Sequence, residues 1–71
     1  MTTYESADRA VEAYDRYIFA APGREYNEEF ADTLAAIAAV ECDTAAHDRT
    51  VNAFTRRHYR RTAEQFWSIC A

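Results

Sequence analysis

The segment NEEFADTLAAIAAVEC, residues 27–42, decides the fold class because it joins a helix start signal to a run of alanines. Asn27 is a good N-cap, and Glu28 and Glu29 follow in the first turn, where carboxylates complement the helix dipole. The alanine side chains are short over much of the helix surface, so a neighbouring helix could approach closely. We expect the core face of this helix to consist of Phe30, Leu34, Ile37 and, at its end, Glu41.

A second helix is predicted before this segment, because Pro22-Gly23 ends the preceding helical pattern and supplies a chain reversal. Thr2 and Glu5 fit a capping box at its start. Apolar residues then recur at spacings of three and four and form a seam. The seam consists of Tyr4, Ala7, Val11, Tyr14 and Ile18. The short loop at residues 24–26 makes the two helices an antiparallel hairpin.

The third helix is harder to delimit, since no Gly or Pro follows Glu41. Capping residue types suggest a break at Asp43-Thr44, and the alternative of one continuous rod stays open. Beyond the break an apolar stripe is predicted on one face. It consists of Val51, Phe54, His58, Thr62, Phe66 and Ile69, and it is flanked by Tyr59, Ala63 and Cys70. A capping-box pattern at 62–65 allows a short fourth helix. The sequence therefore predicts one all-α domain of three helices over residues 1–71.

The composition fits a small helical domain with a thin core. Fifteen of the 71 residues are alanine, whereas valine, isoleucine and leucine together number seven. A core of alanines and rings buries few methylene groups, and a chain this short buries only about 60% of the surface of its unfolded state. We therefore expect a homodimer, in contact through the seam of the first helix or the aromatic residues near the C-terminus.

The cysteine content and the apolar runs favour a cytoplasmic protein. Cys42 and Cys70 are too few for a disulfide framework, which indicates a reducing compartment. The first residues lack the basic and apolar regions of a signal peptide, and the longest apolar run, 35–40, is far shorter than the roughly 20 residues of a membrane span. We expect a cytoplasmic location, the host cytoplasm for a phage-encoded chain, and no membrane partner.

No pattern in the sequence indicates catalysis, a cofactor or a metal. Two thiols and two imidazoles could complete a zinc shell, but their spacing differs from the close ligand pairs of structural zinc sites. These residues are Cys42, His47, His58 and Cys70. A nucleophile needs a base and an orienting group, and a domain with little loop has few places to hold them. We expect a protein without enzyme activity, metal or cofactor.

Charge is segregated along the chain. Residues 1–48 contain eleven acidic residues and three arginines, whereas residues 49–71 contain five arginines and Glu64. The arginines and one tyrosine predict a basic helix face that could bind nucleic-acid phosphates. This face consists of Arg49, Arg56, Arg57, Tyr59, Arg60 and Arg61. The same arginines could instead pair with acids of this chain or of a partner, and the net charge of −4 weakens attraction to DNA.

The acidic half and the surplus of aromatic residues predict a surface that binds another protein, because charge complementarity steers association and aromatic residues anchor interfaces. The candidate residues are Tyr14, Tyr17, Glu28, Glu29, Asp32 and Trp67. A small, acidic, helical chain without catalytic groups resembles in type the phage-encoded inhibitors of host complexes, including anti-CRISPR proteins. That resemblance implies a modulator that binds a macromolecular complex. A subunit that only completes an assembly is a further alternative.

The second half of the chain is also similar to the Hha/YmoA family of nucleoid-protein modulators. The similarity runs from the stretch Thr44-Ala45-Ala46-His47-Asp48-Arg49 through Tyr59 to Trp67. The Asp-His order of the family is reversed here as His47-Asp48, and the first half of the chain does not follow the family. The resemblance implies a small helical regulator that acts by binding another regulator.

Overall fold

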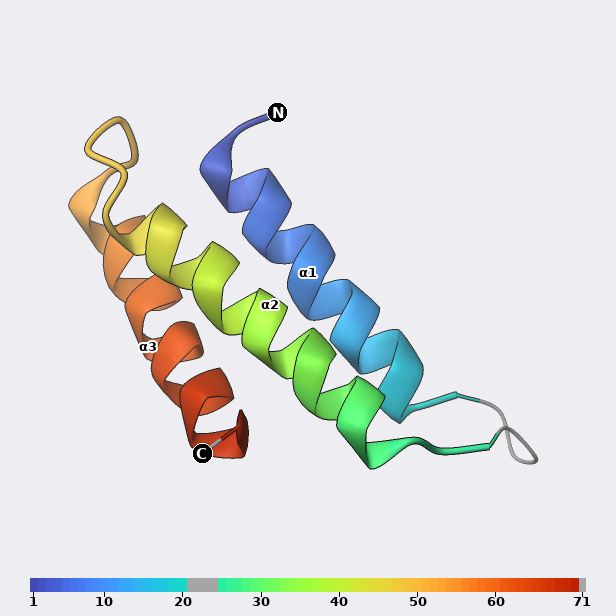
Figure 1. The fold of residues 1–71 in the computed structure, drawn as a ribbon. Coiled ribbons are helices and arrows are strands. Elements are labelled where there is room, and N and C mark those ends of the chain that lie inside the picture. Colours follow the sequence, from blue (N-terminus) through green and yellow to red (C-terminus); the bar gives the residue numbers. More distant parts are fainter. Residues whose placement is uncertain (21–24, 71) are drawn as a thin grey trace.

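The computed structural model describes residues 1–20 and 25–70, and within them it contains three α-helices and no strand. Helix α1 spans Thr3–Ile18, α2 spans Glu28–Ala46 and α3 spans Ala53–Cys70. Figure 1 shows α2 between α1 and α3 and antiparallel to both. The prediction of a small all-α domain with three helices is confirmed.

Side-chain caps begin all three helices. The hydroxyl of Thr2 accepts a hydrogen bond from the backbone N–H of Glu5 at 3.2 Å, and Asn27 Oδ1 accepts one from Phe30 N–H at 3.0 Å. Both caps were predicted from the sequence. Asn52 caps α3 in the same way, with Thr55 N–H as donor at 2.9 Å. The predicted reversal at Pro22-Gly23 lies outside the described residues.

The link between α2 and α3 lies later than predicted. Helix α2 continues through Asp43-Thr44 to Ala46, and Thr44 Oγ1 donates to the carbonyl of Val40 at 3.0 Å instead of capping a new helix. A hydroxyl that bonds one turn back is compatible with a continuing helix. Thr62 makes the same contact with the carbonyl of His58, and α3 runs unbroken to Cys70. The structure therefore has a break between α2 and α3 and, in the described residues, no fourth helix.

The buried side of α2 is formed by small residues, and we name it the inner face. It consists of Ala31, Ala35, Ala38, Ala39, Cys42, Ala45 and Ala46. The predicted core face is wrong, since Phe30 and Ile37 are both nearly half exposed. Alanine lets the neighbouring backbones come close, and rings from α1 and α3 fill the remaining space.

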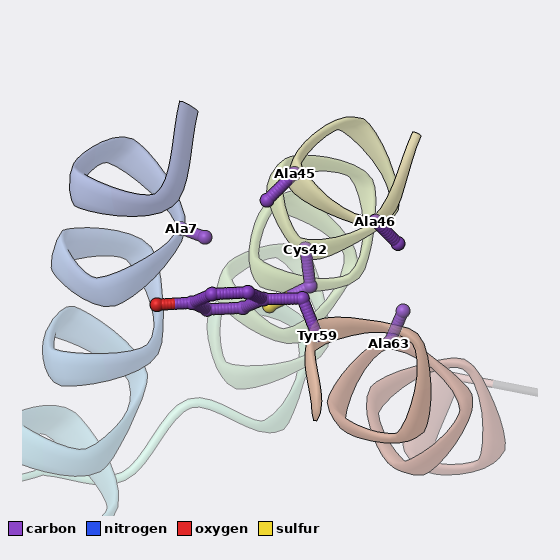
Figure 2. Packing of buried hydrophobic residues seen from close by; sticks show 6 residues of the cluster. All are labelled: Ala7, Cys42, Ala45, Ala46, Tyr59 and Ala63. Carbon is purple, nitrogen blue, oxygen red and sulfur yellow. The ribbon is translucent and has the colours of Figure 1, made fainter. Parts of the chain in front are cut away.

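Helix α3 is rotated relative to the predicted stripe. Its buried residues are Tyr59, Ala63 and Phe66, whereas Phe54 and Ile69 are exposed. Figure 2 shows the ring of Tyr59 against the small residues of α2, with its hydroxyl directed toward α1. Tyr59 Oη donates to Asp8 Oδ1 at 2.6 Å, and burial is the main reason that the pKa of Tyr59 is raised above its usual value. One ring thus joins all three helices.

The seam of α1 packs inside the molecule. Val11 and Tyr14 lie against the buried residues of α2 and α3, and the Tyr14 and Phe66 rings meet edge to face with centroids 5.1 Å apart. The middle of the seam is therefore not free for a second copy, which corrects the dimer contact expected there, while Tyr4 at its start is exposed. Phe66 is likewise buried, so this terminal aromatic residue belongs to the core.

Large apolar side chains lie mainly outside the core, on a flat molecule with principal extents of 42 × 25 × 15 Å. The most exposed of them sit on all three helices and in the segments between them. They include Tyr4, Phe19, Tyr26, Phe30, Ile37, Val40, Phe54, Trp67 and Ile69. Among the described residues, none of the helices combines the length and apolar character that crossing a bilayer requires.

Candidate functional site

A shallow hollow at the N-terminal end of α2 gathers carboxylates around a tyrosine, and we name it the acidic hollow. Its lining residues are Glu25, Tyr26, Asn27, Glu28, Glu29 and Asp32. All six are exposed, and the described lining contains no basic side chain. Three of them, Glu28, Glu29 and Asp32, are the acidic residues predicted for partner binding. The hollow therefore presents concentrated negative charge to solvent.

Tyr17 holds the rim of the acidic hollow in place from inside the molecule. Its hydroxyl accepts a hydrogen bond from Asn27 N–H at 2.7 Å, and its ring lies 4.9 Å from the Phe30 ring and 5.8 Å from the Tyr26 ring. Only 8% of Tyr17 is exposed. Because Asn27 also caps α2, these contacts fix the start of the helix and the position of Tyr26.

The surroundings of Tyr26 disfavour a negative charge on its phenol. Partial desolvation is the main cause that raises the pKa of Tyr26, and negative charge on Tyr14, Glu28 and Asp32 adds to it. Like an ordinary tyrosine, the phenol is protonated at neutral pH and can donate a hydrogen bond, and the raised pKa extends this state to higher pH. An exposed neutral ring among carboxylates suits a partner that offers both cations and apolar surface.

None of the predicted aromatic members of the partner site is exposed beside the acidic ones. Tyr14 and Tyr17 are used in the core, which corrects the expectation that they are surplus to it. Trp67 lies on α3, where it is 43% exposed and its Nε1 donates to Asp43 Oδ2 at 2.8 Å. It does not line the acidic hollow. The sequence located the acids, but Tyr26 is the aromatic residue beside them.

The arginines of the second half form a separate basic surface, which we name the arginine face. It comprises Arg49, Arg56, Arg57, Arg60 and Arg61. In residues 1–20 and 25–70 the one ion pair joins Arg16 and Glu12, so the arginine face makes none within this part of the chain. Arg56 is half-buried, and its Nε has no hydrogen-bond partner. Tyr59 faces inward and does not belong to this surface.

Asp48 lies beside the arginine face and is held by hydroxyl groups. Its carboxylate accepts hydrogen bonds from Thr3 Oγ1 and from Thr50 N–H and Oγ1. These bonds, the one from Thr3 first, lower the pKa of Asp48, and the charge of Arg56 contributes. The carboxylate is thus engaged in fixing the α2–α3 link to the start of α1.

The cysteines and histidines are not assembled into a reactive or metal-binding group in the described part of the chain. In that part no group of three or more His, Cys, Asp or Glu side chains is arranged to hold a metal ion, and Cys42 and Cys70 are free thiols. Burial raises the pKa of Cys42 to about 11, which keeps it a neutral thiol. A buried neutral thiol is a packing residue rather than a nucleophile.

Sequence reasoning missed an apolar surface on the solvent side of α2, which we name the outer face. It consists of Thr33, Ala36, Ile37 and Val40, with Glu41 at its edge. A signal for it was present, since positions 31, 35, 38, 42 and 45 alternate spacings of four and three and contain only Ala or Cys. That seam of small residues predicts the opposite face as the solvent side.

Comparisons of the chain with known protein families, curated proteins and solved structures find no match.

Proposed function

We propose that this protein is a non-enzymatic binding module that presents the acidic hollow to a basic surface of another protein. The observation that carries the proposal is the grouping of four exposed carboxylates around Tyr26 on a rim fixed by Tyr17 and Asn27. Preorganised charge of this kind speeds association and sets specificity. The partner that fits best is a larger complex with a basic groove, and the protein acts as its inhibitor in the manner of phage-encoded proteins such as anti-CRISPR proteins.

A pull-down from a lysate of the native host tests this function. The bait is the tagged chain, and the lysate is used with and without nuclease. The double variant Glu28→Lys/Asp32→Lys should lose a stoichiometric protein partner that wild type retains after nuclease treatment. The control Asp15→Lys/Glu64→Lys changes the net charge equally at exposed sites outside the hollow and should retain the partner. Equal capture by both variants would contradict the assignment of the acidic hollow.

A second function is supported by the arginine face, which makes no ion pair in the described part of the chain. Its guanidinium groups can bind phosphates of nucleic acid, as a nucleoid-associated regulator of the Hha/YmoA type would. Fluorescence anisotropy with single-stranded and duplex oligonucleotides between about 50 and about 200 mM salt tests it. Arg57→Ala/Arg60→Ala should weaken binding and reduce its salt dependence, while binding unaffected by salt would exclude this function.

A further inference from the structure

Phe54 is an aromatic residue in the first turn of α3 that the core does not use. It is 79% exposed and belongs to neither buried cluster. In the described part of the chain no other ring contacts it. One exposed ring is common on a protein surface, so the residues around it decide what it can bind.

The neighbours of Phe54 on the helix surface are two arginines and a second ring. Residues three, four and seven positions apart share one side of a helix, and these positions are occupied by Arg57, His58 and Arg61. All four residues are exposed, on the side of α3 that faces away from its buried residues. We name this group the aromatic-basic strip.

The His58 ring is ordered by the core beneath it. It meets the buried Tyr59 ring edge to face, with centroids 5.0 Å apart. Tyr59 is itself held by its hydrogen bond to Asp8 and by the inner face of α2. The strip therefore presents two neighbouring rings, of which one has a fixed contact with the core.

The start of α3 is positively charged beyond the arginines of the strip. Its first turn has no acidic residue, and the N–H groups at a helix start carry partial positive charge. The arginines of the strip make no ion pair in the described part of the chain. The acids nearest along the chain are Asp48, whose carboxylate is held by hydroxyl groups, and Glu64, about 15 Å of helix beyond Phe54. The first half of α3 therefore favours a negatively charged ligand.

Single-stranded nucleic acid is the ligand whose chemistry matches both parts of the strip. Arginine binds backbone phosphates, and an exposed ring stacks on a base whose face is free. In a duplex the neighbouring base pairs cover the base faces, and the carboxylates of an acidic protein offer nothing to the rings. The strip from Phe54 to Arg61 is about 10 Å long, which covers about three nucleotides at about 3.4 Å each.

We propose that the aromatic-basic strip binds single-stranded nucleic acid, with Phe54 stacked on a base and Arg57 and Arg61 on the neighbouring phosphates. This inference rests on the second function proposed above and names its ligand and its stacking residue. Phe54 takes the part expected of Tyr59, whose ring is buried. Bases and phosphates are common to DNA and RNA, so the strip accepts a single strand of either.

Fluorescence anisotropy of the purified full chain tests the strip with three probes, a labelled oligothymidylate, an oligouridylate and a DNA duplex of similar length. Wild type should bind the single strands more tightly than the duplex at about 50 mM salt. Phe54→Ala should weaken binding to the single strands about tenfold and binding to the duplex by less than about twofold. The matched control Phe19→Ala removes an equally exposed ring, at 81%, from the end of α1 and should bind as wild type does. Tighter binding of one single strand supports the strip and shows whether DNA or RNA is the better ligand.

The chemistry of residue 54 separates stacking from simple apolar contact. Phe54→Trp enlarges the aromatic face and should bind at least as tightly as wild type, whereas Phe54→Leu should be as weak as Phe54→Ala. Circular dichroism should show the same helix content in all variants, because the side chain is exposed. A leucine variant that binds like wild type would overturn the stacking contact.

The same titrations separate this inference from the function on which it rests. Salt-dependent binding that Phe54→Ala leaves unchanged, or weakens equally for single strands and duplex, would overturn the strip but retain nucleic-acid binding by the arginine face. Failure to bind any of the three probes would refute both. Partner capture by the acidic hollow is independent of each of these results.

Discussion

The inner face of α2 has small side chains and the outer face has larger ones, which is the reverse of the usual arrangement in a globular protein. The inner face has no side chain larger than cysteine, whereas the outer face has Ile37 and Val40. Burial in this molecule is thus decided by how closely helices can approach and not by the hydrophobicity of α2 itself. The rings that fill the core come from α1 and α3.

The difference shows where the domain gains its stability. An alanine contributes little transfer free energy on its own, and the buried rings Tyr17, Tyr59 and Phe66 are the largest side chains of the core. The outer face contributes little to the fold of the single chain. Substitutions of the same type should therefore change the stability much more in the core than on the outer face.

Removing a ring tests this difference most strongly. Phe66→Ala deletes the ring that packs against Tyr14 and the alanines of α2, and it should lower the free energy of unfolding by about 3–5 kcal/mol. Phe30→Ala at the start of α2 should cost less than half as much, since nearly half of that ring is already in solvent. Urea unfolding followed by circular dichroism measures both. Equal losses would contradict the assignment of the core.

Adding volume gives the next largest effect. Ala39→Leu on the inner face forces α1 and α3 apart and should cost roughly 1–3 kcal/mol. Ala36→Leu on the outer face has room in solvent and should stay within about 0.5 kcal/mol of wild type. The same urea titrations compare the two variants. A tolerated leucine at position 39 would show that the inner face is not closely packed.

The pH dependence of stability compares the buried thiol of Cys42 on the inner face with the thiol of Cys70 at the edge of the core. Burial raises the pKa of Cys42 from its usual 9.0 to about 11, so the thiol ionises first in the unfolded chain. Its contribution is fully present below pH 9 and is lost as the pH rises toward 11, which should lower stability by roughly 2 kcal/mol. Cys42→Ala should flatten this decline between pH 8 and 10.5, whereas Cys70→Ala at the edge should leave most of it. An unchanged decline in Cys42→Ala would refute the assignment.

The smallest effect is expected at the border between the faces, where Trp67 Nε1 donates to Asp43. Trp67→Phe keeps an aromatic ring but removes the donor and should cost about 1 kcal/mol in thermal or urea unfolding. Asp43→Asn retains an acceptor and serves as the matched control. A larger loss in the control than in Trp67→Phe would show that Asp43 stabilises the fold by another contact.

The candidate site was predictable in its charges but not in its aromatic members. Glu28, Glu29 and Asp32 could be located because a helix start is a local signal and exposed acids need no tertiary contact. Tyr14 and Tyr17 were predicted at the partner surface but pack in the core, because the packing of α1 against α2 and α3 decides which side of a ring is covered. The lack of ion pairs on the arginine face in the described part of the chain could not be predicted either, since ion pairing depends on distances between helices.

The sequence by itself determined the helical class and two of the three helix starts, and it favoured three helices while leaving a continuous rod or a short fourth helix open. These depend on propensity and on capping within a few residues, as at Thr2 and Asn27. Only the tertiary structure decided which faces are buried. Side-chain periodicity marks an apolar stripe, but the close approach of helices selected the alanine seam of α2 over its larger residues. That choice depends on the shape of three helices together, which no single segment encodes.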